Sequence, residues 1–323
     1  MLELCSSDFV RGLTEAIEQL ASLPPGYPWD ILVDTPTSSS EQFVLSTPNG
    51  RLRIAAPVDF SGSTDVGFVV SAADVEIDGM NCRGAIKSSC KSGLLLDSSA
   101  SGAWVHDLVV SNYNTSNSNG HAGVFVYGHP SPVSRVKVEN CVTGPGNGNG
   151  IRLDAVLDCQ IVGNVVSSTQ GQSAEGITFG GSNIRCERNR VDRAWVSGIL
   201  AWNGGAEPYR QLVISDNMIS NSGQANLQIP PQANFAICLN PRSSAIHGVL
   251  LEGNVAYDDQ AQNTQSCLLF LNDDGLGGVL EDGLIEGNLA YDNLSSQAVV
   301  WGSGNKITAT NWVVSQPTAR RTR

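Results

Sequence analysis

Leu250-Leu-Glu-Gly-Asn254-Val-Ala256 and Leu284-Ile-Glu-Gly-Asn288-Leu-Ala290 are nearly the same phrase, repeated 34 residues apart. Each has an apolar, strand-like segment, a corner that carries an asparagine, and a second short apolar segment. Similar phrases place an asparagine at Asn112, Asn140, Asn164, Asn189, Asn217, Asn254, Asn288 and Asn311. The steps between them are 28, 24, 25, 28, 37, 34 and 23 residues. This period is typical of stacked supersecondary units, so the chain is predicted to be a repeat array.

A third strand-like segment follows in each repeat, and it usually opens with a small residue. These segments are residues 93–96, 123–126, 150–153, 176–179, 198–201, 236–239, 267–270 and 298–301. Three short strands per repeat, with apolar residues at alternate positions, predict an all-β fold, the right-handed single-stranded parallel β-helix. Asparagine tolerates a left-handed corner and its amide can bond neighbouring backbone, so the corner residues are expected to form a hydrogen-bonded ladder.

With these repeats and corner asparagines, the chain resembles the pectate-lyase-like superfamily of right-handed β-helices. The resemblance implies an N-terminal helix that plugs the open end of the core, since a solenoid needs a capped end. Residues 8–23 fit that helix, with Ser7 or Asp8 as its N-cap and Pro24 as its stop. Its predicted buried face consists of Phe9, Leu13, Ala16, Ile17 and Leu20.

The sequence therefore predicts a capping region, a repeat region and a tail. Residues 1–65 contain the helix and the first irregular strands, expected at residues 31–33, 43–45 and 52–54. A further irregular strand is expected at residues 68–70, where the repeats begin. Residues 66–316 form the repeats, and residues 317–323 form a C-terminal tail.

Charge and hydropathy exclude two classes of partner. The formal net charge is −12 and lysine occurs at only four positions, which disfavours nucleic acid. No stretch of eighteen apolar residues is present, so no membrane span is expected. The first eight residues lack the basic start and apolar run of a signal peptide. Either the chain does not use that export route or it begins after the signal, and an extracellular or virion-associated location is expected.

Cysteine does not predict a metal site, because no pair has zinc-site spacing. Cys82 and Cys90 flank a short loop and could pair in an oxidising compartment. The cysteines inside or beside strands are expected to pack as small apolar residues: Cys141, Cys159, Cys186, Cys238 and Cys267. No cofactor is predicted, with calcium as a possible exception.

In the superfamily that the chain resembles, substrates lie along the outer face of one sheet, and the third strands match that sheet. Because side chains alternate along a strand, inward-facing Val124 and Ile151 imply outward-facing neighbours. The candidate substrate-binding residues in this row or just past it are Tyr127, Trp202, Asn203, Asn240, Arg242, Asp273 and Asp274. Aromatic faces with amides, carboxylates and guanidinium groups are suited to sugars. Alternation alone would also place polar residues here, for example as a surface ion pair between Arg152 and Asp154.

Catalysis by a glycosidase needs two carboxyl groups about 5 to 9.5 Å apart. Asp154 and Glu175 are the first candidates, because they are expected on neighbouring coils about 4.8 Å apart. Asp273 with Asp274 is a second possible pair. A lyase instead needs a base and a cation, which Arg152 or Arg242 with Tyr127, His121 or His129 could supply. The polygalacturonase motifs are present only as fragments in the wrong order, so that mechanism is not transferred.

Three classes of function stay open. The first is a polysaccharide lyase or glycoside hydrolase, and the second is a glycan-binding module without catalysis. The third is a structural or receptor-binding component of a phage tail or virion, because phage tailspikes resemble this fold and act as trimers. The sequence favours a protein that binds and cleaves a polysaccharide on the outer face of one sheet. The alternative is the non-catalytic virion component, assembled as a homotrimer.

Overall fold

The computed structural model describes residues 1–9, 11–60, 66–88, 91–113, 121–171, 174–205, 207–224, 234–261, 263–271, 278–293, 299–301, 308–310 and 313–314. Asn311, Asp273, Asp274 and Cys90 lie outside this part of the chain, so the predictions made for them stay predictions. The chain divides into two compact units, residues 1–160 and 161–323, and each is described by itself.

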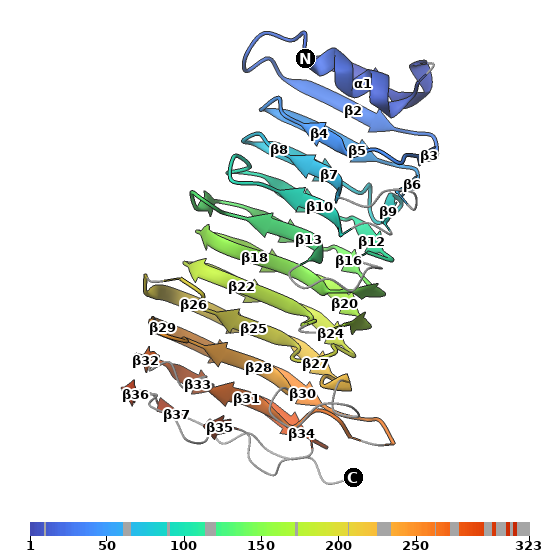
Figure 1. Ribbon diagram of the computed structural model, residues 1–323. Coiled ribbons are helices and arrows are strands. Elements are labelled where there is room, and N and C mark those ends of the chain that lie inside the picture. The colour runs from blue at the N-terminus through green and yellow to red at the C-terminus, as the bar shows by residue number, and fades with distance from the viewer. Residues whose placement is uncertain are drawn as a thin grey trace. The chain divides into compact units, whose positions relative to one another are not determined.

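Each coil of the first unit contributes one strand to each of three parallel sheets, here called the A, B and C strands. The A strands pair in the order β1 (Leu2–Cys5), β2 (Trp29–Val33), β5 (Gly50–Ile54), β8 (Val75–Asp78), β11 (Trp104–His106) and β15 (Lys137–Glu139). The B strands are β3 (Thr37–Ser38), β6 (Val58–Asp59), β9 (Ala85–Lys87), β12 (Val109–Ser111) and β16 (Val142–Thr143). The C strands are β4 (Phe43–Leu45), β7 (Val66–Val70), β10 (Ser92–Leu96), β13 (Ala122–Tyr127) and β18 (Asn149–Leu157), with β14 (Val133–Ser134) paired to β18. Figure 1 shows the C strands succeeding one another along the unit.

The second unit repeats the same three-strand coil, again with parallel pairing. Its A strands are β23 (Ile184–Glu187), β26 (Tyr209–Ser215), β29 (Ala245–Glu252), β32 (Val279–Glu281), β33 (Leu284–Glu286), β36 (Thr308–Thr310) and β37 (Val313–Val314). The B strands are β20 (Val165–Ser167), β24 (Arg190–Asp192), β27 (Met218–Ser220), β30 (Val255–Tyr257) and β34 (Leu289–Tyr291). The C strands are β22 (Ile177–Ser182), β25 (Ile199–Trp202), β28 (Phe235–Asn240), β31 (Cys267–Leu271) and β35 (Val299–Trp301). The remaining short strands are β17 (Gly146–Asn147), β19 (Gln160–Val162) and β21 (Thr169–Gln170).

The core is made of inward-facing side chains stacked in register from coil to coil. On the A strands of the first unit, Ile31, Leu52, Ile77, Val105 and Val138 pair in sequence and are all fully buried. Each such row removes apolar surface from water at every coil, which is the main favourable contribution to folding. The predicted strands at residues 31–33, 43–45, 52–54 and 68–70 are confirmed, and β1, β3 and β6 are additions.

The N-terminal helix is shorter than predicted. α1 spans Leu13–Leu20, and a single 3-10 turn, η1, spans Ser6–Asp8. Gly12 separates them at a φ of 56°, a left-handed conformation that ends helical hydrogen bonding, so neither Ser7 nor Asp8 caps α1. Leu13, Ala16 and Leu20 are buried, and α1 contacts β1, β2 and β4 (Figure 1). The helix thus covers the first coil of the unit, as the capping prediction required.

The asparagine ladder is present in the second unit at Asn164, Asn189, Asn217, Asn254 and Asn288. At each of the first four, the backbone N–H and the side-chain Nδ2 both donate to Oδ1 of the next asparagine, at 2.8 to 3.1 Å. Nδ2 of Asn189, Asn217, Asn254 and Asn288 also donates to a backbone carbonyl, at 2.8 or 2.9 Å. All five are buried, so the ladder satisfies corner groups that water cannot reach.

The ladder prediction was wrong for Asn112 and Asn140, which are exposed. Asn140 lies one residue before the ladder position, at the left-handed corner with a φ of 52°, and the ladder position itself is occupied by buried Cys141. Asn112 follows the B strand β12 instead of the A strand, and Leu108 fills the ladder position of that coil. Asparagine tolerates both kinds of left-handed corner, which is why the sequence pattern did not separate them.

Replacing Asn217 with alanine is expected to lower the free energy of unfolding by about 3 kcal/mol, because the change leaves several buried donors and acceptors without partners. Urea-induced unfolding followed by circular dichroism measures this. Asn140→Gly is the matched control, since it keeps the left-handed corner and should change stability by less than about 0.5 kcal/mol. Equal effects of the two changes would contradict the assignment of the ladder.

Candidate functional site

Tyr127 is the centre of an aromatic and charged surface on the outer face of the first unit's C strands. Its side chain is 42% exposed at the end of β13. The ring centroids of Phe125 and His129 lie 5.5 and 5.0 Å from that of Tyr127. In the next coil, Arg152 pairs in register with Phe125, and Asp154 pairs with Tyr127. The structure therefore brings together three of the predicted site residues: Tyr127, Arg152 and Asp154.

Arg152 and Asp154 form a close ion pair on β18. Nε and Nη2 of Arg152 lie 2.8 and 2.6 Å from Oδ2 of Asp154. The Arg152 guanidinium also lies over the Phe125 ring, 5.3 Å from its centroid, as in a cation–π contact. The side chains are 17% and 10% exposed, respectively. Oδ1 of Asp154 is buried without a hydrogen-bond partner, which is uncommon for a buried carboxylate oxygen.

A second carboxylate, Asp97, was missed by sequence reasoning. It directly follows Leu96, which pairs with Val126, and its backbone N–H donates to the Val70 carbonyl, so Asp97 continues the ladder beside Tyr127. Oδ1 of Asp97 accepts from the Ser99 N–H at 2.8 Å, and Oδ2 accepts from the Ser71 hydroxyl. Tyr127 thus has a carboxylate on each side, on strands about 9.6 Å apart.

A regular offset in the sequence could have revealed Asp97. Asp97, Tyr127 and Asp154 each lie four residues after the glycine that opens their strand. In the second unit the same offset leads to Gly180, Trp202 and Asn240. In the first unit each of the three residues also lies three positions after a buried, inward-facing residue, Leu94, Val124 or Ile151. An odd offset changes the face of the strand, so this row faces outward.

In the second unit, Trp202 and Asn240 pair in register on β25 and β28. The Arg242 guanidinium lies 5.6 Å from the centroid of the Trp202 ring, and the Arg242 N–H donates to Oδ1 of Asn240 at 3.1 Å. These three predicted residues therefore meet. Because Arg242 covers one face of the indole, the surface offers less aromatic area than Tyr127 does.

Two other predicted residues, Asn203 and Glu175, lie in the described part of the second unit and are buried. Asn203 is fully buried: its Nδ2 donates to the carbonyls of Glu207 and Ala245, and its Oδ1 accepts from Gly205 N–H. This amide holds its own turn and cannot reach a surface ligand. Glu175 is 7% exposed, and its Oε2 accepts from Thr178 Oγ1 at 3.4 Å. Its pairing with Asp154 stays a prediction, because the two residues belong to different units.

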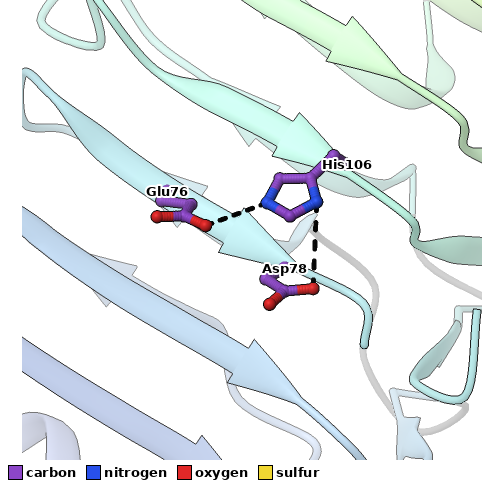
Figure 2. Close-up of side chains that lie close together, drawn as sticks. All are labelled: Glu76, Asp78 and His106. Atoms are coloured by element: carbon purple, nitrogen blue, oxygen red, sulfur yellow. Dashed lines mark hydrogen bonds and ion pairs between the residues drawn. The ribbon is translucent and has the colours of Figure 1, made fainter. Parts of the chain in front are cut away.

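A second polar cluster lies on the outer face of the first unit's A strands, and sequence reasoning missed it. Figure 2 shows His106 of β11 between Glu76 and Asp78 of β8. The His106 Nε2 lies 3.0 Å from Oε1 of Glu76, and Nδ1 lies 2.9 Å from Oδ2 of Asp107 and 3.8 Å from Oδ1 of Asp78. The Trp104 ring stacks on the His106 ring at 4.0 Å, and Trp104 is 39% exposed.

Both ring nitrogens of His106 face carboxylates, which accept hydrogen bonds and cannot donate them when ionised. The protonated imidazolium satisfies both sides at once. Burial alone would lower the pKa of His106, but the hydrogen bonds to Asp107 and Glu76 and the charge of Asp78 outweigh it, so the pKa is raised above its usual value.

The cluster also has the ligand types of a transition-metal site, since one ligand atom each of Glu76, Asp78 and His106 lies within 4.8 Å of the others. The Asp78 carboxylate is already occupied, however. Its Oδ1 accepts from Met80 N–H at 2.7 Å, and its Oδ2 accepts from Arg51 Nη2. The Arg51 Nε lies 3.1 Å from Oε1 of Glu76, within ion-pair distance although without hydrogen-bond geometry. Arg51 and the protonated His106 therefore offset two of the three carboxylates, Glu76, Asp78 and Asp107, and the cluster is best described as an ion-pair network.

His106 is expected to make stability depend on pH. A group whose pKa is raised on folding stabilises fully below its unfolded value, about 6.5, and this stabilisation is lost as pH rises through the folded pKa. The difference in melting temperature between the wild type and His106→Gln should therefore be largest near about pH 6 and should shrink in alkali. In a Glu76→Gln background the pH-dependent part of this melting-temperature difference should be smaller. A difference that stays constant with pH would rule out the imidazolium.

The described cysteines are free thiols. Cys141, Cys159, Cys186, Cys238 and Cys267 are buried free thiols, as predicted for small core residues. Cys82 is an exposed free thiol. Within the described residues, no helix is both long and apolar enough to span a membrane.

No protein-family model matches the chain. No curated protein matches it in sequence. Solved structures do match it, with low sequence identity. A double mutant of the tailspike protein of E. coli bacteriophage HK620 aligns with 96% of this chain and 62% of its own, at a TM-score of 0.68 and 14% identity. The endo-xylogalacturonan hydrolase from Aspergillus tubingensis aligns with 94% of this chain and 89% of its own, at a TM-score of 0.61 and 10% identity.

The pectate lyase Pel9A aligns with 99% of this chain and 78% of its own, at a TM-score of 0.55 and 10% identity. The chain spans less than two thirds of the length of the HK620 tailspike and of the Dettilon tailspike, of which it covers 64%. At these identities the likeness concerns the fold. This chain has the right-handed parallel β-helix fold shared by tailspikes, pectate lyase and glycoside hydrolases.

Proposed function

We propose that the protein binds a polysaccharide along the outer face of the first unit's C strands. The observation that carries this proposal is the exposed Tyr127 ring between the carboxylates of Asp97 and Asp154. A sugar ring stacks on the aromatic face, and its hydroxyls donate to the flanking carboxylates. Support also comes from the fold, because the names of two matched structures, a pectate lyase and an endo-xylogalacturonan hydrolase, indicate action on polysaccharides.

The same arrangement supports cleavage of the bound chain. Asp154 and Asp97 stand on strands about 9.6 Å apart. We propose that their carboxyl groups act as the acid and the base of hydrolysis, a role that needs the two groups about 6.5 to 9.5 Å apart. The Arg152 guanidinium holds the Asp154 carboxylate in place through two contacts.

The second candidate is a non-catalytic component of a phage tail or virion. Two tailspike proteins among the matched structures favour it, one of them at a TM-score of 0.68. In this setting the same Tyr127 surface binds a polysaccharide receptor without cleaving it. Both candidates place the protein outside the cell or on a virion, and the second adds assembly as a homotrimer.

Tyr127→Ala is expected to weaken polysaccharide binding about tenfold, because the stacking surface is removed. Affinity electrophoresis in gels containing each polysaccharide measures the change. Trp104→Ala is the matched control: it removes an aromatic ring of similar exposure from the A strands of the same unit. Equal loss in both variants would contradict a site at Tyr127.

Asp154→Asn is expected to lower kcat at least about 100-fold if the protein cleaves its ligand, because the amide cannot exchange a proton with the reacting groups. Reducing ends and ultraviolet absorbance are followed together, since a lyase product absorbs and a hydrolase product does not. A melting temperature within a few degrees of the wild type shows that the fold is kept. Turnover by the wild type and by Asp154→Asn at the same rate would remove Asp154 from the mechanism, and no turnover by the wild type would favour the virion component.

A further inference from the structure

We infer that the sugar bound at Tyr127 is uncharged, so that the surface selects neutral polysaccharides over uronate polymers. This inference rests on the proposed function and deepens it. It follows from how the charges around Tyr127 are already paired.

The cation beside Tyr127 is already neutralised. A uronate is normally recognised by an arginine that meets its carboxylate with two parallel hydrogen bonds. Arg152 instead directs Nε and Nη2 toward Oδ2 of Asp154, at 2.8 and 2.6 Å, and its guanidinium lies over the Phe125 ring. A sugar carboxylate would have to compete with Asp154 for the same two nitrogens.

The groups that flank Tyr127 are acceptors. The outward-facing residues Leu95, Phe125, Tyr127, Asp97, Asp154 and Arg152 include two carboxylates and one guanidinium, which gives this set a formal charge of −1. An ionised carboxylate offers several acceptor positions and no donor. Hydroxyl groups of a sugar supply donors to these positions, whereas a uronate carboxylate adds a like charge.

One carboxylate oxygen of Asp154, Oδ1, has no hydrogen-bond donor. This oxygen is buried, while Oδ2 holds Arg152. A buried acceptor left unpaired costs free energy that a donor recovers. Oδ1 is covered in the free protein, so a small rotation of the carboxylate on ligand binding would present it to a sugar hydroxyl. A sugar hydroxyl supplies such a donor, whereas an ionised carboxylate group does not.

The charge of the sugar also decides the chemistry of cleavage. Elimination by a lyase removes a proton beside a sugar carboxylate, and a neutral sugar has no such carboxylate. In hydrolysis the oxygen of water bonds to the anomeric carbon while the glycosidic carbon–oxygen bond breaks. One carboxylate accepts a proton from the water, and the other carboxyl group gives a proton to the leaving oxygen. A surface that selects neutral sugars therefore acts by hydrolysis if it cleaves.

The test compares polymers that differ only in charge. Pectate and alginate are each used in native form and after chemical reduction of their carboxyl groups, beside neutral glucans, mannans, galactans and xylans. Binding by the wild type is expected to be at least tenfold tighter for a reduced polymer than for its native form. Asp154→Asn releases Arg152 from its ion pair, so this variant should gain affinity for the native polymers. The ratio of its affinity for a reduced polymer to that for the native form should fall about tenfold.

Glu3→Gln is the matched control, because it makes the same change in net charge at an exposed position of β1, on the A strands. Its ratio should equal that of the wild type. A gain in affinity for an acidic polymer in Asp154→Asn alone cannot arise from partial unfolding. A ratio shifted equally by both variants would mean that overall charge, and not the Tyr127 surface, sets the preference, and would overturn the inference.

Tyr127→Ala separates the failure of the inference from the failure of the proposed function. If the wild type binds native polymers as tightly as reduced ones, and Tyr127→Ala loses both, the site stands and its neutral preference is wrong. If Tyr127→Ala binds every polymer as the wild type does, or the wild type binds none of the panel, the proposed function fails and the inference fails with it.

Discussion

The stacking of one coil on the next depends on satisfying the backbone at the buried corner between the A and B strands. In the second unit five asparagines do this with a continuous set of hydrogen bonds, each linking residues 25 to 37 positions apart in the chain. Because the same Oδ1 accepts from both the backbone and the side chain of the preceding asparagine, each corner is held in one position relative to its neighbour. The side chains on the strands are therefore aligned in rows from coil to coil.

The first unit reaches the same coil with different corners. Leu108 and Cys141 stand where the second unit has asparagine, and both are fully buried. The Cys141 thiol lies 3.4 Å from the Glu139 carbonyl, so a small apolar residue with a weak donor replaces the amide. Neighbouring A strands of the first unit are also linked by outward ion pairs, such as Arg53 with Asp30, 2.8 Å apart. Thus the corner must be filled and satisfied, but more than one residue type can do it.

The outer faces show how register turns a repeated strand into a site. Residues at one offset from the opening glycine form a line across the coils, and each coil adds one side chain to it. In the first unit this line places Asp97, Tyr127 and Asp154 side by side. In the same way, the register of the A strands places Asp78 beside His106. Equivalent positions of the second unit carry Trp202 and Asn240, so the same backbone presents a different surface. Single outward positions therefore determine which surface the constant backbone presents.

The sequence by itself determined the three-strand coil, most strand positions and the outward direction of Tyr127, Arg152 and Asp154, because strand alternation and corner residues are local properties of the chain. Only the tertiary structure decided which asparagines form the ladder, since Asn140 and Asn164 occupy similar phrases but differ by one position at the corner. It also decided that Asn203 is consumed by its own turn, that Asp97 stands beside Tyr127, and that His106 lies between carboxylates. Asp97 and Tyr127, like Glu76 and His106, lie 30 positions apart in the chain, and the length of each loop sets which side chains meet. The periodicity of the sequence determines the fold, whereas the register between coils determines which outward side chains lie together.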